Sequence, residues 1–346
     1  MFYTLSVLNK VIPKEIESLM RRYAILKNIQ LFQPVGRRML ATKLHIGEKL
    51  VRSDTDFFRE ENYLEVTAAG MMLTDSGLSL LEELKAIMKE MEGIQTLEEA
   101  LRTRLGVKDL IIVSGDTDQD LESLNNIGRA AAKYLQDLIK EDSIVALTGG
   151  HTVKSVVRYV KETTQSKKGS LMKALIVPAR GSLGNNVETQ ANTLVEELAK
   201  KLHCAYLLLN LPDNLSAKAI EGVVKDPNIK KTIQEIKKAN IIVFGVGNAQ
   251  KMAYRRDLHT KVIDILNEKN AVAEALGYYF NESGEMVYDS KTIGFHLEEF
   301  EKSIYPIAVA GGRSKARAIL AVRKFVQNGC LIIDEACATH VMELLP

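Results

Sequence analysis

One sequence pattern recurs in the second half of the chain: a short apolar run ends in a loop, and a helical pattern follows. The apolar runs lie at residues 144–148, 174–178, 241–244, 307–310 and 331–334. Short apolar runs that alternate with helical segments predict a parallel sheet whose strands are joined by helices. From Asp109 onward we therefore expect an α/β domain of Rossmann-like architecture, because both faces of a parallel sheet must be covered.

The loops after the first four runs are rich in glycine, which predicts an anion-binding crevice. Glycine lets the backbone approach a ligand closely, and the free amide groups at the start of a helix attract an anion. Ligands of open α/β sheets bind beyond the carboxyl ends of the strands, so these loops should converge. The candidates on them are Gly149, Gly150, His151 and Thr152 in the first loop, Arg180 in the second, and Ser314 and Lys315 in the fourth.

These side chains suit a ligand that carries two separate phosphate groups. Thr152 offers a hydroxyl, Arg180 a bidentate fork and Lys315 a point charge. Arg255 and Arg256 lie on the helix after the third loop, 245–250, which is not G-x-G-x-x-G and so predicts no dinucleotide site. The alternative is that the glycines only close tight turns, that His151 is merely solvated, and that Glu274 is an exposed acid rather than a ligand of sugar hydroxyls.

Residues 1–73 have a different pattern, typical of DNA binding. Helical patterns at 19–31, 37–44 and 48–61 precede two apolar runs that predict a hairpin. Helix, helix, tight turn, helix and hairpin is the order of a winged helix-turn-helix, whose helix after the turn enters the major groove. Between residues 20 and 53 there are eight basic residues and one acid. This basic excess favours a nucleic-acid partner over the alternative, a small helical subdomain that docks on the α/β domain.

The helix at 48–61 is predicted to face DNA with its polar side. We expect Leu50, Val51 and Phe57 on its inner face. Basic and hydroxyl side chains outside that face can contact base edges or phosphates. The DNA-binding candidates are Arg37, Arg38, Lys43, Lys49, Arg52, Ser53 and Thr55.

Residues 74–105 carry one long helical pattern that begins at the plausible cap Thr74. Apolar residues recur at steps of three and four from Leu78 to Ile94, which forms a seam rather than a broad face. We expect this linker helix to pair two subunits into a homodimer or tetramer, because helix-turn-helix proteins usually read two-fold sites. The alternative is that the seam packs against the effector domain, residues 106–346, of the same chain.

Composition excludes several classes of protein. Hydrophobic residues make up 46% of the 346 residues, too much for a disordered chain and enough for more than one core. No apolar run approaches the roughly 20 residues of a membrane span, and the start lacks a signal-peptide pattern. Three cysteines without Cys-x-x-Cys spacing argue against disulfides and structural zinc. We expect a cytoplasmic protein with no cofactor, no metal and no membrane partner.

Several motifs resemble the SorC family of sugar-responsive transcription regulators, over almost the whole chain. They are Pro34-Val35-Gly36-Arg37-Arg38, Ile111 to Asp116, Val177 to Gly181, Gln190-Ala191-Asn192-Thr193, Gly277 to Asn281, and Val309 to Gly312. The resemblance implies a repressor of an operon for lower glycolytic enzymes, with an effector domain like a sugar isomerase and fructose 1,6-bisphosphate as inducer. It places one phosphate on residues 149–152 and the second at Arg180, with Gln190, Arg255, Glu274 and Lys315 around the sugar and phosphates.

Two positions depart from the pattern of that family. His151 stands where a threonine is usual, and Arg313 stands where a small residue is expected. Both add potential positive charge, so phosphate binding is expected to persist.

Two alternatives to a repressor remain at this point. The α/β domain is also compatible with a sugar-phosphate isomerase or deaminase fused to a DNA-binding module, since fold alone does not decide function. An isomerase needs a positioned base, and no convincing acid–base pair is evident, so we expect no enzyme. A sugar-responsive activator is equally compatible with the sequence.

Overall fold

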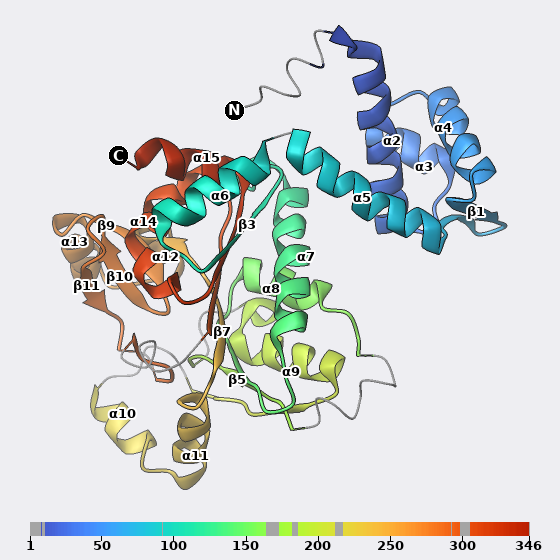
Figure 1. Cartoon of the computed structure of the whole chain (residues 1–346). Helices are drawn as coiled ribbons and strands as arrows, with labels where there is room; N and C mark the ends of the chain where they lie inside the picture. The colour runs from blue at the N-terminus through green and yellow to red at the C-terminus, as the bar shows by residue number, and fades with distance from the viewer. Residues whose placement is uncertain are drawn as a thin grey trace. The chain divides into compact units, whose positions relative to one another are not determined.

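The structure, a computed structural model, describes residues 8, 11–91, 93–163, 173–181, 186–211, 217–291, 293–297 and 305–345. The chain forms two compact units, residues 1–96 and 97–346 (Figure 1). No helix in the described ranges is long and apolar enough to cross a membrane.

The N-terminal unit contains the elements of the predicted winged helix-turn-helix in the predicted order. They are α2 (Pro13–Phe32), α3 (Arg37–Leu44), α4 (Glu48–Glu60), β1 (Leu64–Thr67) and β2 (Gly70–Leu73). α3 ends at His45, whose left-handed φ of 53° turns the chain toward α4. β1 and β2 pair antiparallel, and Leu26, Leu40 and Phe58 form part of the buried core beneath them.

Residues 74–105 form two helices, so the expectation of a single long helix is wrong. α5 (Asp75–Met91) and α6 (Ile94–Leu105) are separated at Gly93, whose φ of +72° is left-handed. Glycine adopts that conformation without the penalty that a side chain would incur. α5 does begin at the expected cap, because the hydroxyl oxygen of Thr74 accepts a hydrogen bond from the amide of Gly77 at 3.0 Å.

α5 completes the core of the N-terminal unit. Leu81 is fully buried in the same cluster as residues of α2, α3 and α4, and Leu78 and Leu84 pack against that cluster. Met88 is buried with Ile16 of α2. Part of the seam that we expected to pair two subunits is therefore covered by α2 of its own chain.

The C-terminal unit is built on a seven-stranded parallel sheet, which confirms the α/β prediction. The strand order is β3-β13-β12-β7-β4-β5-β6. The strands are β3 (Asp109–Val113), β4 (Ile144–Leu147), β5 (Leu175–Pro178), β6 (Ala205–Tyr206), β7 (Ile241–Gly245), β12 (Tyr305–Val309) and β13 (Cys330–Asp334). β4 marks the point where the chain reverses its direction of travel, because β5 and β6 follow on one side and β7, β12 and β13 on the other.

Helices cover this sheet. Three of them lie together in Figure 1, namely α7 (Leu121–Leu138), α8 (His151–Tyr159) and α9 (Ala191–Leu202). Their apolar residues share one core with the strands. The remaining helices of the unit are α10 (Ala217–Val223), α11 (Pro227–Ile236), α12 (Ala249–Arg255), α13 (Thr260–Glu268), α14 (Ala316–Val322) and α15 (Glu335–Leu344).

A second, antiparallel sheet follows β7. It has the order β11-β10-β9-β8, and the strands are β8 (Gly247–Asn248), β9 (Ala271–Ala275), β10 (Tyr278–Asn281) and β11 (Met286–Asp289). Tyr279 of β10 is fully buried in a cluster with residues of α12 and α13. This small sheet carries Glu274 on β9 and sets it beside Gly247 of β8.

Candidate functional site

The first glycine loop and the start of α12 both lie where the large sheet changes direction. Gly149 and Gly150 lead from β4 into α8, residues 246–248 lead from β7 into α12, and β4 and β7 are neighbours. Gly150 has a φ of +123°, and a Cβ on Gly149 would lie 2.5 Å from the carbonyl oxygen of Thr189. Both positions therefore require glycine. This is the place where an open α/β sheet binds its ligand.

A direct, solvent-exposed contact joins the start of α8 to the end of α12. Nη2 of Arg255 lies 3.0 Å from Nδ1 of His151, the first residue of α8. A guanidinium group can only donate hydrogen bonds, so Nδ1 accepts and the imidazole ring is neutral. Burial lowers the pKa of His151, and the positive charges of Arg255 and Lys154 lower it further.

Two lysines extend this group of positive charges. Lys315 is half-buried, and its pKa is lowered by burial and by the charges of Lys251 and Arg255, while Glu274 and Asp118 act in the opposite direction. Lys251 was not among our candidates from the sequence. It lies one helical turn before Arg255 on α12, and that four-residue spacing was the signal that could have found it.

A buried cluster of charged side chains lies beside these residues. Oε1 of Glu274 accepts hydrogen bonds from Nη2 of Arg256 at 2.5 Å and from the amide of Gly277 at 2.8 Å, and it lies 3.8 Å from Nη1 of Arg180. The side chains of Glu274, Arg180 and Arg256 are 4%, 5% and 9% exposed. Burial and the neighbouring Arg256 lower the pKa of Arg180. Two guanidinium groups thus share one carboxylate out of contact with water.

Donors in this cluster are left over after these bonds are made. Nε and Nη1 of Arg256 and the hydroxyl of Tyr279 are buried and have no hydrogen-bond partner among the described residues. The hydroxyl of Thr148, directly before Gly149, is also buried without a hydrogen-bond partner among the described residues. Buried polar groups without partners are costly, so donors of this kind indicate a ligand that supplies acceptors.

Ser314, a candidate from the sequence, is bonded by an acid of the same chain. Its amide and its hydroxyl donate to the carboxylate of Asp118 at 2.8 and 3.0 Å. A Cβ on Gly312 would lie 2.5 Å from that carboxylate. Asp118 therefore occupies the place at the fourth loop where we expected an anion. Arg313 is bound by Glu343 of α15 at 2.7 Å, so the charge that it adds to this loop is already paired.

The other candidates for effector binding lie around the first glycine loop. Gln190 is the N-cap of α9, and its backbone packs against Gly149. Thr152 is the second residue of α8 and is half-buried. Residues 182–185 of the second loop lie outside the described residues.

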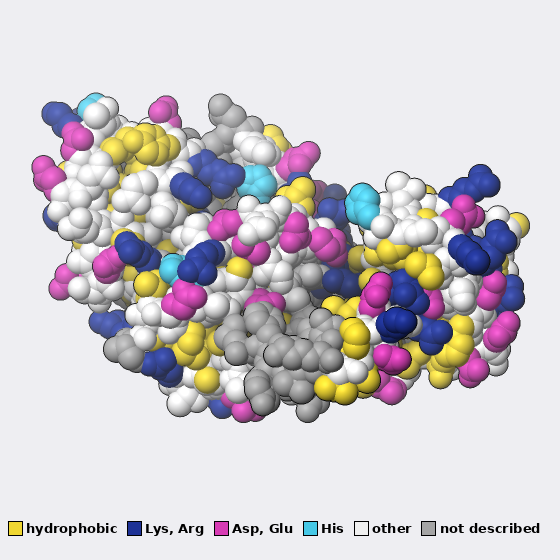
Figure 2. All heavy atoms as spheres, turned by 90° about the horizontal axis from the view of Figure 1, so that it is seen from above, with side chains coloured by type: hydrophobic (Ala, Val, Ile, Leu, Met, Phe, Trp, Pro, Cys, Tyr) yellow, Lys and Arg dark blue, Asp and Glu magenta, His cyan; other side chains and the backbone are white. Residues whose placement is uncertain are grey.

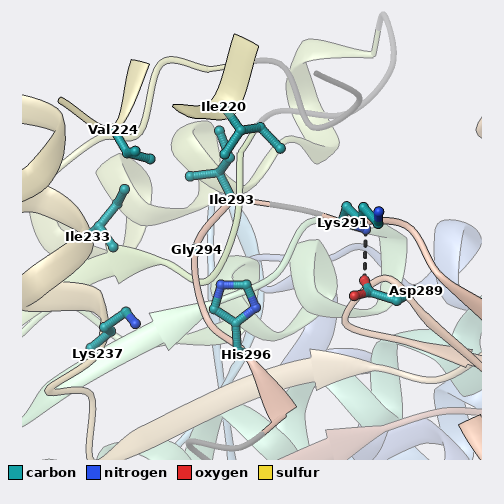
Figure 3. Close-up of a pocket in the computed structure, with 9 residues that line it drawn as sticks. All are labelled: Ile220, Val224, Ile233, Lys237, Asp289, Lys291, Ile293, Gly294 and His296. Carbon is teal, nitrogen blue, oxygen red and sulfur yellow. Dashed lines mark hydrogen bonds between the residues drawn. The ribbon is translucent and has the colours of Figure 1, made fainter. Parts of the chain in front are cut away.

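A separate pocket lies between α10, α11 and the segment 289–296 (Figure 3). Ile220, Val224 and Ile233 line one part of it, and Lys237 and His296 point into another. Gly294, at its floor, pairs with Arg180 through an isolated bridge. The pocket thus borders the buried cluster, but it contains none of our candidates for effector binding.

The N-terminal unit exposes several of the predicted DNA-binding residues. Lys49, Arg52 and Ser53 on α4 are exposed, as are Arg38 and Lys43 on α3. Figure 2 shows basic side chains on this unit, interspersed with acidic ones. The side chain of Arg38 is 91% exposed, with Nε 3.7 Å from Glu48, and Nζ of Lys43 lies 3.8 Å from the ring centre of Phe32.

Three predictions for α4 are wrong. Thr55 is only 1% exposed, whereas Leu50 and Phe57, expected inside, are 46% and 37% exposed. Phe58 takes the core position that we assigned to Phe57, so the buried face of the helix is displaced by one residue at its second half.

Some of the basic residues of the N-terminal unit form ion pairs within the unit itself. Arg37 donates to the hydroxyl of Thr55 at 3.2 Å and to Asp56 at 2.6 Å, which fixes α3 against α4. Asp54 is 2% exposed and accepts from Arg21 and Arg22 at 2.7 and 2.9 Å. These arginines stabilise the unit, and the exposed residues of α3 and α4 are left as the surface that can face DNA.

Comparison with known proteins assigns each of the two units to a family. Residues 19–88 match the family described as "CggR N-terminal DNA binding domain", and residues 89–343 match the family described as "Putative sugar-binding domain". The chain is 38% identical over 339 residues to the central glycolytic genes regulator of Priestia megaterium, which covers 98% of each protein.

Solved structures agree with this assignment. A "putative SorC family transcriptional regulator" from Enterococcus faecalis has a TM-score of 0.66 at 32% identity and covers 71% of this chain and 99% of its own. The full-length sorbitol operon regulator SorC from Klebsiella pneumoniae has a TM-score of 0.67 at 18% identity, with 92% and 97% covered, and supports the fold.

The fold and the site define a transcriptional regulator in which a DNA-binding domain is joined to a sugar-binding domain, and not an enzyme. Within that class, the chain belongs to the SorC family and is a relative of the central glycolytic genes regulators. The resemblance stated from the sequence motifs is therefore confirmed.

Proposed function

We propose that the protein represses an operon of glycolytic genes by binding operator DNA, and that fructose 1,6-bisphosphate releases it. The observation that carries the effector assignment is that Nε and Nη1 of the buried Arg256 have no hydrogen-bond partner among the described residues. Buried polar groups without partners are costly. An anion bound beside Arg256 accepts hydrogen bonds from these donors.

A second anion fits the first glycine loop. There the start of α8, His151, Arg255 and Lys251 present donors and positive charge, and Lys315 lies close enough to Glu274 and Arg255 to respond to both. Lys315 thus lies within electrostatic range of both places. A short sugar with a phosphate at each end supplies an anion to both and hydroxyls between them, whereas a monophosphate supplies one.

The DNA-binding part of the proposal rests on α3 and α4. Lys49, Arg52 and Ser53 lie on the exposed side of α4, after the tight turn that places such a helix in the major groove. Arg38 and Lys43 flank it and are suited to phosphates. Central glycolytic genes regulators are the relatives named above, and this supports a glycolytic operon as the target.

Repression, a cytoplasmic location and assembly into homodimers or tetramers are further parts of this proposal. Operators with two half-sites require two DNA-binding units, which a dimer supplies. An activator would use the same DNA and sugar contacts, and the sign of regulation therefore has to be measured on a promoter.

The decisive experiment is a gel shift with the DNA upstream of the operon that encodes the protein, with and without fructose 1,6-bisphosphate. We expect the complex to dissociate at a sugar concentration that leaves it intact when fructose 6-phosphate is used. Arg180→Ala should bind DNA normally and fail to respond to the sugar, and Thr152→Val should respond more weakly than the wild type, because only a hydroxyl is lost. Arg317→Ala, which removes an exposed arginine paired with Glu282, is the matched control. Release of Arg180→Ala at the wild-type sugar concentration would contradict the proposed site.

A further inference from the structure

We propose that His151 takes up a proton when a phosphate group binds at the first glycine loop, so that effector affinity rises as the pH falls. This inference rests on the proposed function, since it concerns the same crevice. It assigns to His151 a role as a proton-linked ligand.

The geometry without ligand fixes the state of the ring. Nη2 of Arg255 donates to Nδ1 of His151 at 3.0 Å. Because Nδ1 is engaged as an acceptor, a proton can be added there only if this bond is broken. The free protein therefore holds His151 neutral through a specific contact between α12 and α8.

The charged groups around the ring are of one sign. Arg255 faces it from α12, and Lys154 lies one turn further along α8, where Glu188 of the neighbouring 3₁₀ turn pairs with it. Both cations lower the pKa of His151, in addition to the effect of burial.

Two charged residues of the other helices packed on α8 contact its far end. Arg129 of α7 bonds to the hydroxyl of Tyr159, and Lys201 of α9 bonds to the carbonyl oxygens of Val157 and Arg158. These contacts are more than a helical turn from His151. Among the described residues, the charges that act on the pKa of His151 are those of Arg255 and Lys154, and both are positive.

A bound phosphate reverses the effect of the surroundings on the pKa of His151. A phosphate dianion has only acceptors toward the protein, so Arg255 can donate to it and give up Nδ1 of His151. An anion within about 4–6 Å favours the charged form of a histidine and raises its pKa by 1–3 units. The ring then takes one proton from the medium and donates to the phosphate as a cation. No other bond changes in this step.

The sign of the pH dependence follows from these two states. The pKa of His151 is below its usual value in the free protein and higher in the complex. Between the two values, binding takes up as much as one proton, and affinity increases as the pH falls through this interval. The gain approaches tenfold for each unit by which the two pKa values differ. The second ionisation of the phosphate itself, with a pKa of about 6, acts in the opposite direction and is present in every variant.

The test is an NMR titration of the histidine ring signals of the full chain, free and with either inorganic phosphate or fructose 1,6-bisphosphate. The chain has six histidines, and His151→Asn identifies the signal of interest. His340→Asn is the control, because His340 lies on α15 and pairs with Glu343. Calorimetry in buffers of different ionisation enthalpy measures the proton uptake in the same variants.

We expect the His151 signal to titrate at higher pH with ligand, and the proton uptake to be smaller in His151→Asn than in the wild type and in His340→Asn. Equal uptake in all three, with fructose 1,6-bisphosphate bound, overturns the inference and leaves the proposed function intact. Failure of the bisphosphate together with proton-linked binding of inorganic phosphate overturns the proposed effector and supports the role of His151. Absence of binding by both ligands overturns both.

Discussion

Arg256 donates from Nη2 to Oε1 of Glu274 at 2.5 Å, although both side chains are almost completely buried. The same carboxylate oxygen lies 3.8 Å from Arg180. One acid thus lies beside two buried cations, and we expect it to affect both the stability of this site and its affinity for anions.

Replacement of that acid is expected to make folding depend on anions. In Glu274→Gln, the buried guanidinium group of Arg256 loses the carboxylate that pairs with it, and removal of one partner from a buried ion pair costs about 3–5 kcal/mol. We expect thermal unfolding of the C-terminal unit at a lower temperature. Inorganic phosphate should restore more of the loss than in the wild type, because the anion compensates the uncovered charge. Glu196→Gln, which removes an acid that pairs with Lys200 on α9, is the control, and an equal response of both variants to phosphate would contradict the cluster as an anion site.

Loss of Arg52 is expected to weaken operator binding. A bidentate contact of an arginine with a base edge contributes about 1–3 kcal/mol, so Arg52→Ala should bind roughly 5- to 150-fold more weakly at low salt. Arg59→Ala, at the last turn of the same helix, removes an equal charge near Asp56 and should have a much smaller effect. Gel shifts at several salt concentrations distinguish a phosphate contact, which reduces the salt dependence, from a base contact. Unchanged affinity of Arg52→Ala would exclude α4 as the recognition helix.

Asp118 is expected to oppose anion binding at the fourth loop. Its carboxylate accepts from the amide and hydroxyl of Ser314 and lies near enough to Lys315 to raise the pKa of that lysine. Asp118→Asn keeps an oxygen acceptor for Ser314 and removes the negative charge. A unit charge at about 4 Å is worth about 1 kcal/mol in water, so phosphate should bind about fivefold more tightly. Calorimetry with inorganic phosphate measures this, and weaker binding would show that Asp118 supports the site instead.

The stability of the large sheet is expected to depend on pH through Asp109. Burial raises the pKa of this acid, but hydrogen bonds from Tyr134 and Tyr305, at 2.7 and 2.6 Å, and nearby cations outweigh burial, so the pKa is lowered. Because the folded-state pKa is depressed, the stabilisation is fully present above the unfolded-state value of about 4 and is lost as the pH falls through the folded value.

Tyr305→Phe removes one of these hydrogen bonds. A hydrogen bond to a charged group contributes about 1.5–3 kcal/mol, and we expect a loss of about that size in the free energy of unfolding at pH 7. The loss should shrink as the pH falls below 4 and approaches the lowered folded-state pKa of Asp109. Chemical denaturation at pH 7 and pH 3 tests this, with Tyr254→Phe, at an exposed tyrosine, as the control. A loss of equal size at both pH values would show that the hydroxyl acts without the carboxylate.

The sequence predicts the elements well because their signals are local. The strand at 330–334 is buried throughout and the strand at 241–245 is buried up to Phe244, and the helix at 37–44 is bounded by Gly36 and by the turn at His45. The position of His151 and Arg255 in one crevice could also be expected, since both follow the carboxyl ends of parallel strands.

The errors arise where tertiary contacts decide. On α4, both Phe57 and Phe58 are compatible with a helical pattern, and the pairing of Asp54 with Arg21 and Arg22 fixes which side is inside. The bond from Asp118 to Ser314 joins residues 196 positions apart, and the sequence carries no signal for it. The same holds for the burial of Arg256 beside Glu274, which depends on the small sheet folding over α12.

The place of α5 determines where this protein can be divided and recombined. A fragment that ends at residue 73 would lack Leu81 and Met88, and the apolar sides of α2 and the hairpin would be left open to solvent. A fragment that ends after Met91 retains these side chains, and the two family matches meet between residues 88 and 89. Chimaeras that exchange sugar-binding domains should therefore be joined near Gly93, where the helix is already interrupted and an inserted or deleted residue disturbs neither core.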